Sequence, residues 1–242
     1  MKIPISIEPC PIIEAIIEVR IDTKTPGEAI LGVVYNEFKT DYPNIEKLPI
    51  LQIPEQFRSS DPNLRYKPYY QLKNDQTIIQ IGTKVVSFVN VGKYLGWPTF
   101  SEKAYNVFER LYKDFEIEKT HRVAVRYVNL FNNTNIFDRL KLQIVLNQDD
   151  FSDNEINLVA NIHSQNCINR LSIANRANVL VNNKMLTGSI VDIDTVIKTC
   201  PNDVHTNISA FKKCIEQAHN EEKELFYKLL REDYVATLNP KY

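Results

Sequence analysis

The fold class follows most directly from the sequence between Tyr69 and Val91, YYQLKNDQTIIQIGTKVVSFVNV. Its apolar residues fall into three short runs, at 69–73, 77–82 and 85–91. These runs are rich in the β-branched and aromatic residues that favour strands. The connections NDQ and GTK between them have turn composition. Because connections this short join antiparallel neighbours, the segment predicts a three-stranded antiparallel meander.

Upstream of the meander, residues 12–22 alternate between apolar and polar side chains, which predicts a strand buried on one face. The apolar face carries Ile13, Ala15, Ile17, Val19 and Ile21, and the other face carries Glu14, Glu18, Arg20 and Asp22, together with Ile16. The sequence Thr25-Pro26-Gly27-Glu28 then predicts a capped helix start, and an apolar stripe continues to Tyr42. Residues 45–68 are rich in proline and irregular, with one short strand expected at 48–53.

Downstream of the meander, residues 90–102 lead into a second helix, for which Thr99 to Glu102 predicts a capping box. Further strands are predicted at 120–132, 139–147, 155–163, 167–181 and 188–196, the fourth of them bent, with a turn at Asn182-Asn183. A long final helix is predicted at 208–234, where Glu222 interrupts the apolar stripe.

The predicted element order is therefore β-α-βββ-α-βββββ-α. Most connections are too short for parallel crossovers, so we predict an α+β fold with a large, mostly antiparallel sheet and three helices packed on it. We interpret residues 1–242 as a single domain. Two sub-halves, 1–116 and 117–242, are the alternative, because each has several strands and ends in a helix. The halves share no visible sequence repeat.

The composition argues against several classes of protein. The chain has 29 basic and 30 acidic residues, interspersed, which disfavours nucleic-acid binding by bulk electrostatic attraction. Six glycines are few for a phosphate-binding loop. No apolar run approaches the roughly 18 residues of a membrane span, and prolines interrupt the region where a signal peptide would be continuous. The four cysteines follow no disulfide framework, so we expect reduced thiols and a cytoplasmic location.

The histidines and cysteines do not predict a metal site. Cys200 and His205, and also Cys214 and His219, are each separated by four residues. On one helix Cys214 and His219 would point about 140° apart, at roughly 100° per residue, so they cannot bind the same ion. The sequence lacks the motifs of nucleotide-binding loops, serine hydrolases and zinc proteases. We therefore expect no metal and no cofactor, and the sequence assigns no catalytic residue.

Charged side chains on predicted strands give the best candidate site. Glu18 and Arg20 share one face of the first strand, and Arg122 and Arg126 share one face of the strand that follows the second helix. If a large antiparallel sheet lays these strands side by side, the groups form either a polar pocket or an ion-pair ladder. The ladder is the favoured interpretation.

Three segments together resemble a sporadically distributed family of uncharacterised bacterial proteins of about this length. They are PIIEAIIEVRI at 11–21, YLGWPTF at 94–100 and VAVRYVN at 123–129. Lys93 and Leu95 stand where that family usually has proline. The resemblance covers the first half of the chain well and the second half loosely. It implies no activity, although a patchy distribution suggests a link to mobile elements or defence.

The positions that the resemblance carries over are Glu18, Arg20, Trp97, Arg126 and Asn129. One interpretation is architectural: Trp97 and Phe100 plug the corner between sheet and helix as structural anchors, and Arg126 pairs with Glu18. The other is functional: Glu18, Arg20, Arg126 and Asn129 surround a pocket that accepts an anion or a carboxylate of a partner.

Two functions follow as hypotheses. The leading one is a non-catalytic module that binds a partner protein or a small anionic ligand through its sheet face, without membrane or nucleic acid. It rests on the lack of any recognisable catalytic constellation. The final helix leaves two interpretations open, packing on its own sheet or pairing with a second copy in a homodimer.

The competing hypothesis is an enzyme that acts on an anionic or phosphorylated substrate. Arg20 and Arg126 would bind the anion, and Glu18 or the pair Asp192 and Asp194 would hold a metal or act as the base. The two aspartates point the same way on a predicted strand, but a solvent-facing strand end is the simpler interpretation of them.

Overall fold

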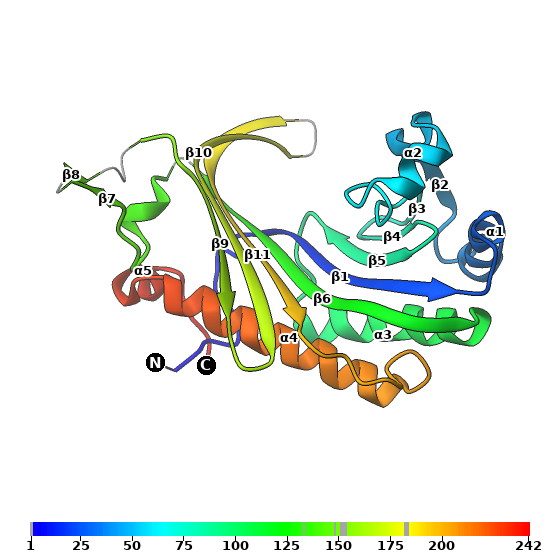
Figure 1. The fold of residues 1–242 in the computed structure, drawn as a ribbon. Coiled ribbons are helices and arrows are strands. Elements are labelled where there is room, and N and C mark those ends of the chain that lie inside the picture. Colours follow the sequence, from blue (N-terminus) through cyan, green and yellow to red (C-terminus); the bar gives the residue numbers. More distant parts are fainter. Residues whose placement is uncertain (1, 133, 148, 151–153, 182–183) are drawn as a thin grey trace.

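The computed structural model describes residues 2–132, 134–147, 149–150, 154–181 and 184–242. The main sheet contains β1 (Ile12–Thr23), β2 (Asn44–Lys47), β3 (Tyr70–Lys73), β4 (Thr77–Ile81), β5 (Val85–Val91), β6 (Ile117–Asn132), β9 (Asn157–His163), β10 (Cys167–Val181) and β11 (Lys184–Ile197). The α-helices are α1 (Gly27–Phe38), α2 (Glu55–Ser60), α3 (Trp97–Asp114), α4 (Ile208–Leu229) and α5 (Glu232–Thr237). The predicted α+β fold with its long C-terminal helix is confirmed (Figure 1).

The nine strands follow the order β2-β3-β4-β5-β1-β6-β11-β10-β9, and neighbours are antiparallel. The predicted meander is β3, β4 and β5. The order β3-β4-β5-β1 of the first half recurs as β9-β10-β11-β6 in the second, and each half then continues into a long helix, α3 or α4. The two halves join where β1 pairs with β6, with Ile17 opposite Val125.

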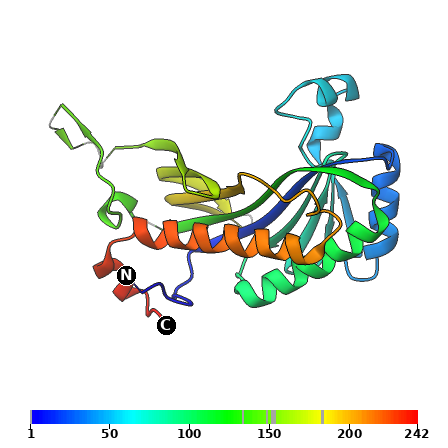
Figure 2. The ribbon, with the colours of Figure 1, turned by 60° about the horizontal axis from the view of Figure 1, so that its bottom comes forward.

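The helices α3 and α4 lie across the same face of the sheet, and α1 packs beside them at one end (Figures 1 and 2). The alternation in β1 sends Ala15, Ile17 and Val19 to this face, where they are fully buried with Phe100 of α3 and Phe211 of α4. On the opposite face, the segment around α2 rises at one side and β10 with β11 rises at the other, which leaves the centre of the sheet without a helix over it (Figure 1).

The two predicted helix caps are wrong. The helix α1 starts after Pro26, and no side chain caps it. The helix α3 starts at Trp97, two residues before the predicted cap Thr99, and Gly96 is its N-cap with φ +80°. That conformation strongly favours glycine, so the backbone turn at Gly96, rather than a threonine hydroxyl, sets the start of α3.

Two predicted strands are replaced by other structures. Residues 48–53 contain a 3-10 helix, η1 (Pro49–Gln52), because proline fixes φ and removes a sheet donor. Residues 139–147 come directly after a second 3-10 helix, η2 (Ile136–Asp138). The strand that they contribute is β7 (Val145–Leu146), which pairs with β8 (Asp149–Asp150). The place beside β6 that this segment would need is already taken by β11.

Three further details concern the second half. The bend predicted in β10 is confirmed as an irregularity between Ala174 and Ala177, where Arg176 has φ +56°. The predicted turn Asn182-Asn183 lies outside the described residues. The final helix is divided, because Leu230 is extended between α4 and α5.

None of the helices in the described part of the chain is both long and apolar enough to cross a membrane.

Candidate functional site

The helix-free face carries charged side chains at the centre of the sheet. They are Glu18 and Arg20 from β1, Arg122 and Arg126 from β6, and Asp192 and Asp194 from β11. The register places Arg20 opposite Arg122, and Arg126 opposite Asp194. Intervening residues such as Val125 point toward the helices and are buried. The sheet therefore gathers charged residues from three strands on one surface.

Arg126 and Asp192 form a bidentate pair. The Nε and Nη2 groups of Arg126 donate to the two carboxylate oxygens of Asp192 at 2.8 and 2.7 Å. This geometry is among the strongest for charged hydrogen bonds, and it raises the pKa of Arg126 above its usual range. The expectation that Arg126 pairs with Glu18 is wrong, because the register sets Arg126 against Ile16 instead.

Arg122 joins the other two carboxylates. Its Nη2 donates to both oxygens of Asp194 at 2.5 and 2.7 Å, and its Nε lies 3.1 Å from Glu18 Oε1. Arg20 Nε donates to the same Glu18 oxygen at 2.8 Å. These contacts are the ion-pair ladder that the sequence favours. Asp192 and Asp194 lie near the end of β11 on the helix-free face, as the simpler interpretation expects, but each is held by a guanidinium group and its side chain is 18% exposed.

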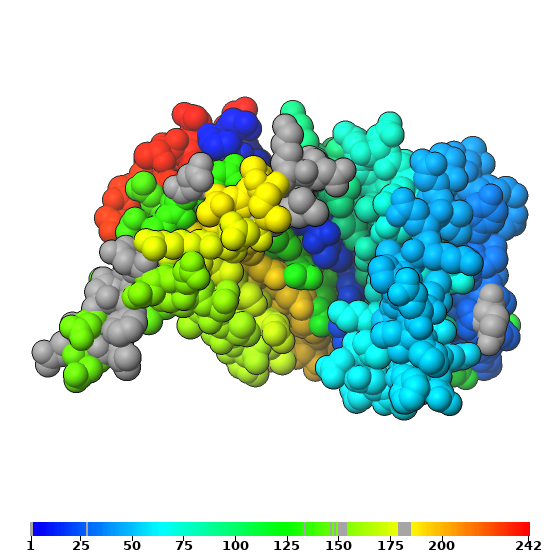
Figure 3. Space-filling view, turned by 90° about the horizontal axis from the view of Figure 1, so that it is seen from above, coloured from blue at the N-terminus to red at the C-terminus, as the bar shows by residue number. Residues whose placement is uncertain are grey.

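The ladder lines the floor of an open hollow of about 960 Å³, which we call the trough. Figure 3 shows it from above, between the lobe that contains β9 and β10 (yellow-green to yellow) and the segment around α2 (cyan), with β1 (blue) at its floor. Pro49, Pro62 and Pro68 lie along the α2 side. The ring of Tyr66 lies 4.7 Å from the guanidinium carbon of Arg20.

The trough carries more basic than acidic side chains. Of the described residues that line it, five are basic, Arg20, Lys67, Arg122, Arg126 and Arg170, and three are the carboxylates of the ladder. Lys67 and Arg170 are exposed, and within the described residues neither has an ion-pair partner. Lys67 precedes β3 and Arg170 lies on β10, with five strands between them in the sheet. The surplus positive charge thus stands on opposite sides of the trough.

Asn129 does not join Glu18, Arg20 and Arg126. It is three residues from Arg126 on β6, so it points to the opposite face of the sheet. There it is 2% exposed, and its side-chain amide donates to the carbonyl oxygen of Val191 at 3.1 Å. The interpretation that all four residues share one pocket is therefore wrong.

Asn129 instead lines a second cavity of about 300 Å³, which we call the inner pocket. Its walls come from the N-terminal segment at 5–12, the junction at 94–97, β6 and α4. The polar groups that reach it from β6, α4 and the junction include Tyr94, Tyr127, His219 and Glu222. The sheet separates this pocket from the trough.

Three of these groups form one hydrogen-bonded chain. The hydroxyl of Tyr127 lies 2.9 Å from Nδ1 of His219 and 3.2 Å from the hydroxyl of Tyr94. Burial lowers the pKa of His219 to about 3, so its ring is neutral at physiological pH. Burial also raises the pKa of Tyr127 well above its usual value. The chain is therefore neutral and internally satisfied.

Glu222 is the residue that sequence reasoning missed. It is 4% exposed and continues the buried stripe of α4, four residues after Ala218 and four before Phe226. Burial raises its pKa well above the usual value, opposed by the nearby charge of Lys223. Among the described residues none donates a hydrogen bond to its carboxyl group. Its spacing within the stripe was the available signal of burial.

The expected anchors close the corner between sheet and helix. Phe100 is fully buried, and its ring centre lies 5.5 Å from that of Phe88. Trp97 stacks on His219 with ring centres 3.8 Å apart and donates from Nε1 to Glu216 at 3.0 Å. Trp97 also lines the inner pocket, so it reaches both the helix α4 and the cavity.

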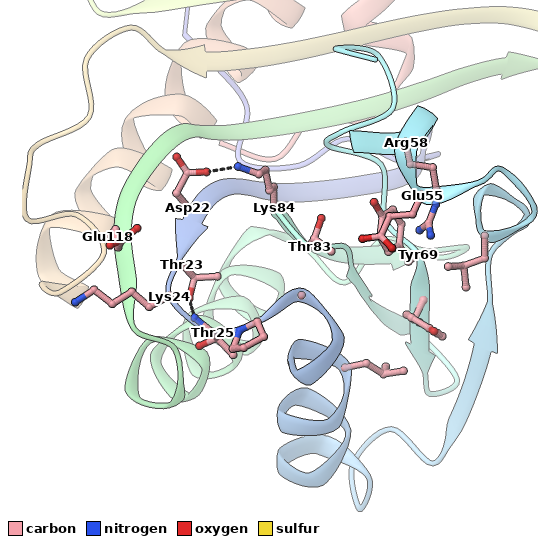
Figure 4. Close-up of a pocket in the computed structure, with 15 residues that line it drawn as sticks. Asp22, Thr23, Lys24, Thr25, Glu55, Arg58, Tyr69, Thr83, Lys84 and Glu118 are labelled. Carbon is pink, nitrogen blue, oxygen red and sulfur yellow. Dashed lines mark hydrogen bonds and ion pairs between the residues drawn. The ribbon is translucent and has the colours of Figure 1, made fainter. Parts of the chain in front are cut away.

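A third cavity of about 590 Å³ lies at the end of β1 (Figure 4). Asp22 accepts a hydrogen bond from Lys84 at 2.7 Å and lies 2.5 Å from His121 Nε2, which together lower its pKa to about 2. The guanidinium carbon of Arg58 lies 4.3 Å from the ring centre of Tyr69. Among the side chains that the structure describes, three basic and three acidic residues line this cavity, so their charges balance.

The described residues contain no cluster of three or more histidine, cysteine or acidic side chains that could hold a metal ion. The four cysteines are free thiols. Burial raises the pKa of Cys167 and of Cys214 to about 11, which keeps both thiols protonated and weakly reactive.

No protein-family model matches the chain. A comparison with curated proteins also finds no match. The resemblance to the sporadically distributed bacterial family therefore stays a prediction from three segments.

Proposed function

We propose that this protein is a non-catalytic binding module that receives an acidic segment of a partner polypeptide in the trough. The observation that carries the proposal is the surplus positive charge at Lys67 and Arg170 on opposite sides of a helix-free sheet face. An acidic segment that crosses the trough meets both cations, while the ladder beneath it is already neutralised.

The ladder suits a binding floor because its charges are fixed in place before any partner arrives. Bidentate contacts such as Arg126 with Asp192 restrict both side chains, so a partner loses little affinity to ordering them. The volume of about 960 Å³ is near the upper end of small-molecule pockets, roughly 300–1,000 Å³. An open hollow of this size fits a short stretch of polypeptide.

Nucleic acid fits the same surface less well. Glu18, Asp192 and Asp194 lie on the floor and would repel a continuous phosphate backbone, which needs an uninterrupted basic track. The chain as a whole has a formal net charge of −1, so long-range attraction does not favour nucleic acid either. Discrete carboxylates can be spaced to avoid the acidic floor.

The enzyme hypothesis receives no support from the geometry. Asp192 and Asp194 are each engaged by an arginine, so neither is available as a base or a metal ligand without breaking the ladder. Glu18 accepts from Arg20 and also lies against Arg122.

A charge-reversal experiment tests the proposal. A fluorescein-labelled peptide of alternating Glu and Gly is titrated with the full-length protein, and binding is followed by fluorescence anisotropy. We expect the double variant Lys67→Glu, Arg170→Glu to weaken binding by about tenfold or more, equivalent to about 1.4 kcal/mol. The matched control is Lys39→Glu, Lys213→Glu, which makes the same change in net charge at exposed positions outside the trough.

Three results would overturn the proposal. The first is no measurable binding of the acidic peptide by the unmodified protein. The second is equal weakening by both double variants, which would mean that only net charge matters. The third is tighter binding of a single-stranded oligonucleotide of equal charge than of the peptide, which would assign the surface to nucleic acid.

A further inference from the structure

The inner pocket, on the helix side of the sheet, contains a buried acid without a partner. We propose that it binds a small amphipathic primary amine, with the ammonium group on the Glu222 carboxylate and the apolar part against the surrounding aromatic rings. The proposal is independent of the trough, because the two cavities lie on opposite faces of the sheet.

The environment of Glu222 is the first argument. The carboxyl group lines the pocket and is 4% exposed, yet no described residue donates a hydrogen bond to it or pairs with it. A buried polar group without a partner is unfavourable for folding. A ligand that supplies the missing partner removes this cost, and an ammonium group supplies both charge and hydrogen bonds.

The second argument is that several other polar groups of the pocket already have hydrogen-bond partners within the protein. The hydroxyls of Tyr94 and Tyr127 and the Nδ1 atom of His219 form one chain. The amide group of Asn129 donates to a backbone carbonyl. Among the described residues that line the pocket, Glu222 is the buried carboxyl group, and no described residue donates a hydrogen bond to it, so it can offer a ligand a charged contact.

Aromatic rings supply the third argument. Tyr94, Trp97, Tyr127, Phe226 and Tyr227 line the pocket. Aromatic faces attract ammonium groups and also bury the carbon skeleton of a ligand. The volume of about 300 Å³ restricts the ligand to a small molecule, such as an aromatic monoamine.

The charged and titratable groups around Glu222 are consistent with a cationic ligand. On α4, His219 is neutral and Lys223 is the cation nearest in sequence, but Lys223 makes no ion pair with Glu222 among the described residues. Consecutive side chains of a helix point about 100° apart, so the ammonium group of Lys223 is directed away from the carboxyl group of Glu222. The N-terminal segment contributes Glu8 and the Cys10 thiol, whose pKa burial raises.

Binding has a defined proton balance. In the empty pocket burial raises the pKa of Glu222, so its carboxyl group retains the proton to higher pH than an ordinary glutamate does. An amine arrives as its ammonium ion, because free amines are protonated at neutral pH. Formation of the ion pair therefore releases the Glu222 proton to solvent, up to one proton for each ammonium bound. Affinity should rise with pH by up to about tenfold per unit while Glu222 stays protonated in the free protein.

The experiment titrates the full-length protein with phenethylamine. Trp97, the single tryptophan of the chain, lines the pocket and reports binding by its fluorescence. Calorimetry at pH 7 in two buffers of different ionisation enthalpy counts the protons released. We expect Glu222→Gln to weaken binding by about tenfold or more and to abolish proton release. Glu224→Gln, on an exposed position of the same helix, should bind as the unmodified protein does.

Two ligands and one further variant distinguish recognition of an amine from recognition of an acid or of an uncharged ring. We expect 2-phenylethanol and 3-phenylpropanoate to bind more weakly than the amine. Lys223→Gln should tighten amine binding, because it removes a like charge. If 3-phenylpropanoate bound more tightly than phenethylamine, and Lys223→Gln weakened its binding, the pocket would be a site for acids and the proposal would be overturned. Equal binding of the alcohol, or no binding of phenethylamine, would overturn it as well.

Discussion

The pH dependence of stability gives a direct test of the buried acid, because the protonation of Glu222 differs between the folded and unfolded states. Burial raises its pKa in the folded protein well above the ordinary value of 4.5. Above pH 4.5 the unfolded chain releases this proton while the folded protein retains it. The free energy of unfolding therefore falls as pH rises toward the folded pKa, by up to about 1.4 kcal/mol per pH unit.

His219, one turn earlier on α4, has the opposite effect at lower pH. Burial lowers its pKa from 6.5 to about 3. Between these values the unfolded chain binds one more proton, so stability falls as pH falls below 6.5. The full difference corresponds to about 5 kcal/mol. From pH 4.5 to 6.5 the contributions of His219 and Glu222 cancel, and above pH 6.5 the contribution of Glu222 is seen without that of His219.

The perturbation is Glu222→Gln, which keeps the shape of the side chain and removes the titration. Urea unfolding followed by Trp97 fluorescence at pH 6.5 and pH 8 gives the free energy of unfolding of each protein. We expect the unmodified protein to lose up to about 2 kcal/mol more than the variant over this interval. Glu224→Gln is the control and should follow the unmodified protein. Parallel profiles for the unmodified protein and Glu222→Gln would mean that Glu222 is ionised when folded and would refute the reasoning.

Three further predictions concern packing and the ladder. Phe100→Ala should lower the free energy of unfolding by about 3–5 kcal/mol, because Phe100 is fully buried against Phe88; a loss below about 1 kcal/mol in urea unfolding would contradict this. Gly188→Ala should cost about 1–3 kcal/mol, because the new Cβ would lie 2.5 Å from a backbone oxygen of β6, and an unchanged melting temperature would contradict it. A double-mutant cycle of Arg126→Ala and Asp192→Ala should give a coupling energy of about 1 kcal/mol, since both side chains are partly exposed; no coupling would mean that the pair does not form in solution.

The local pattern of the sequence was sufficient for the fold class, because alternation and short turns determine antiparallel strands within about ten residues. The bounds of β10 match the predicted 167–181. The pairing of β1 with β6 was not predictable, because strand register across the two halves depends on contacts between distant segments. The same limit accounts for the error at 139–147, whose sequence pattern resembles a strand although β6 already has two neighbours.

The candidate site was only partly predictable. Alternation places Glu18 and Arg20 on one face of β1, and the pairing of β1 with β6 brings Arg126 to the same trough. Asn129 does not belong with them, and its odd spacing from Arg126 along β6 is the sequence signal that places it on the other face. In the sequence Glu222 interrupts the apolar stripe, because charged residues are rarely fully buried without a partner. Only the packing of α4 on β6 and the N-terminal segment shows that it is enclosed.

The two cavities differ in what a ligand does to stability. In the trough most charges are balanced by contacts within the protein, such as Arg126 with Asp192, so the floor is complete without a partner. In the inner pocket the carboxyl group of Glu222 has no such contact among the described residues, and the folded state bears its unfavourable burial until a ligand arrives. A ligand that binds only the folded protein stabilises it according to its affinity and concentration.

For an amine in the inner pocket this stabilisation should also increase with pH, because the proton that Glu222 retains must leave on binding. Binding in the trough involves no such proton release from Glu222, so the pH dependence of ligand-induced stabilisation distinguishes which face of the sheet a ligand occupies.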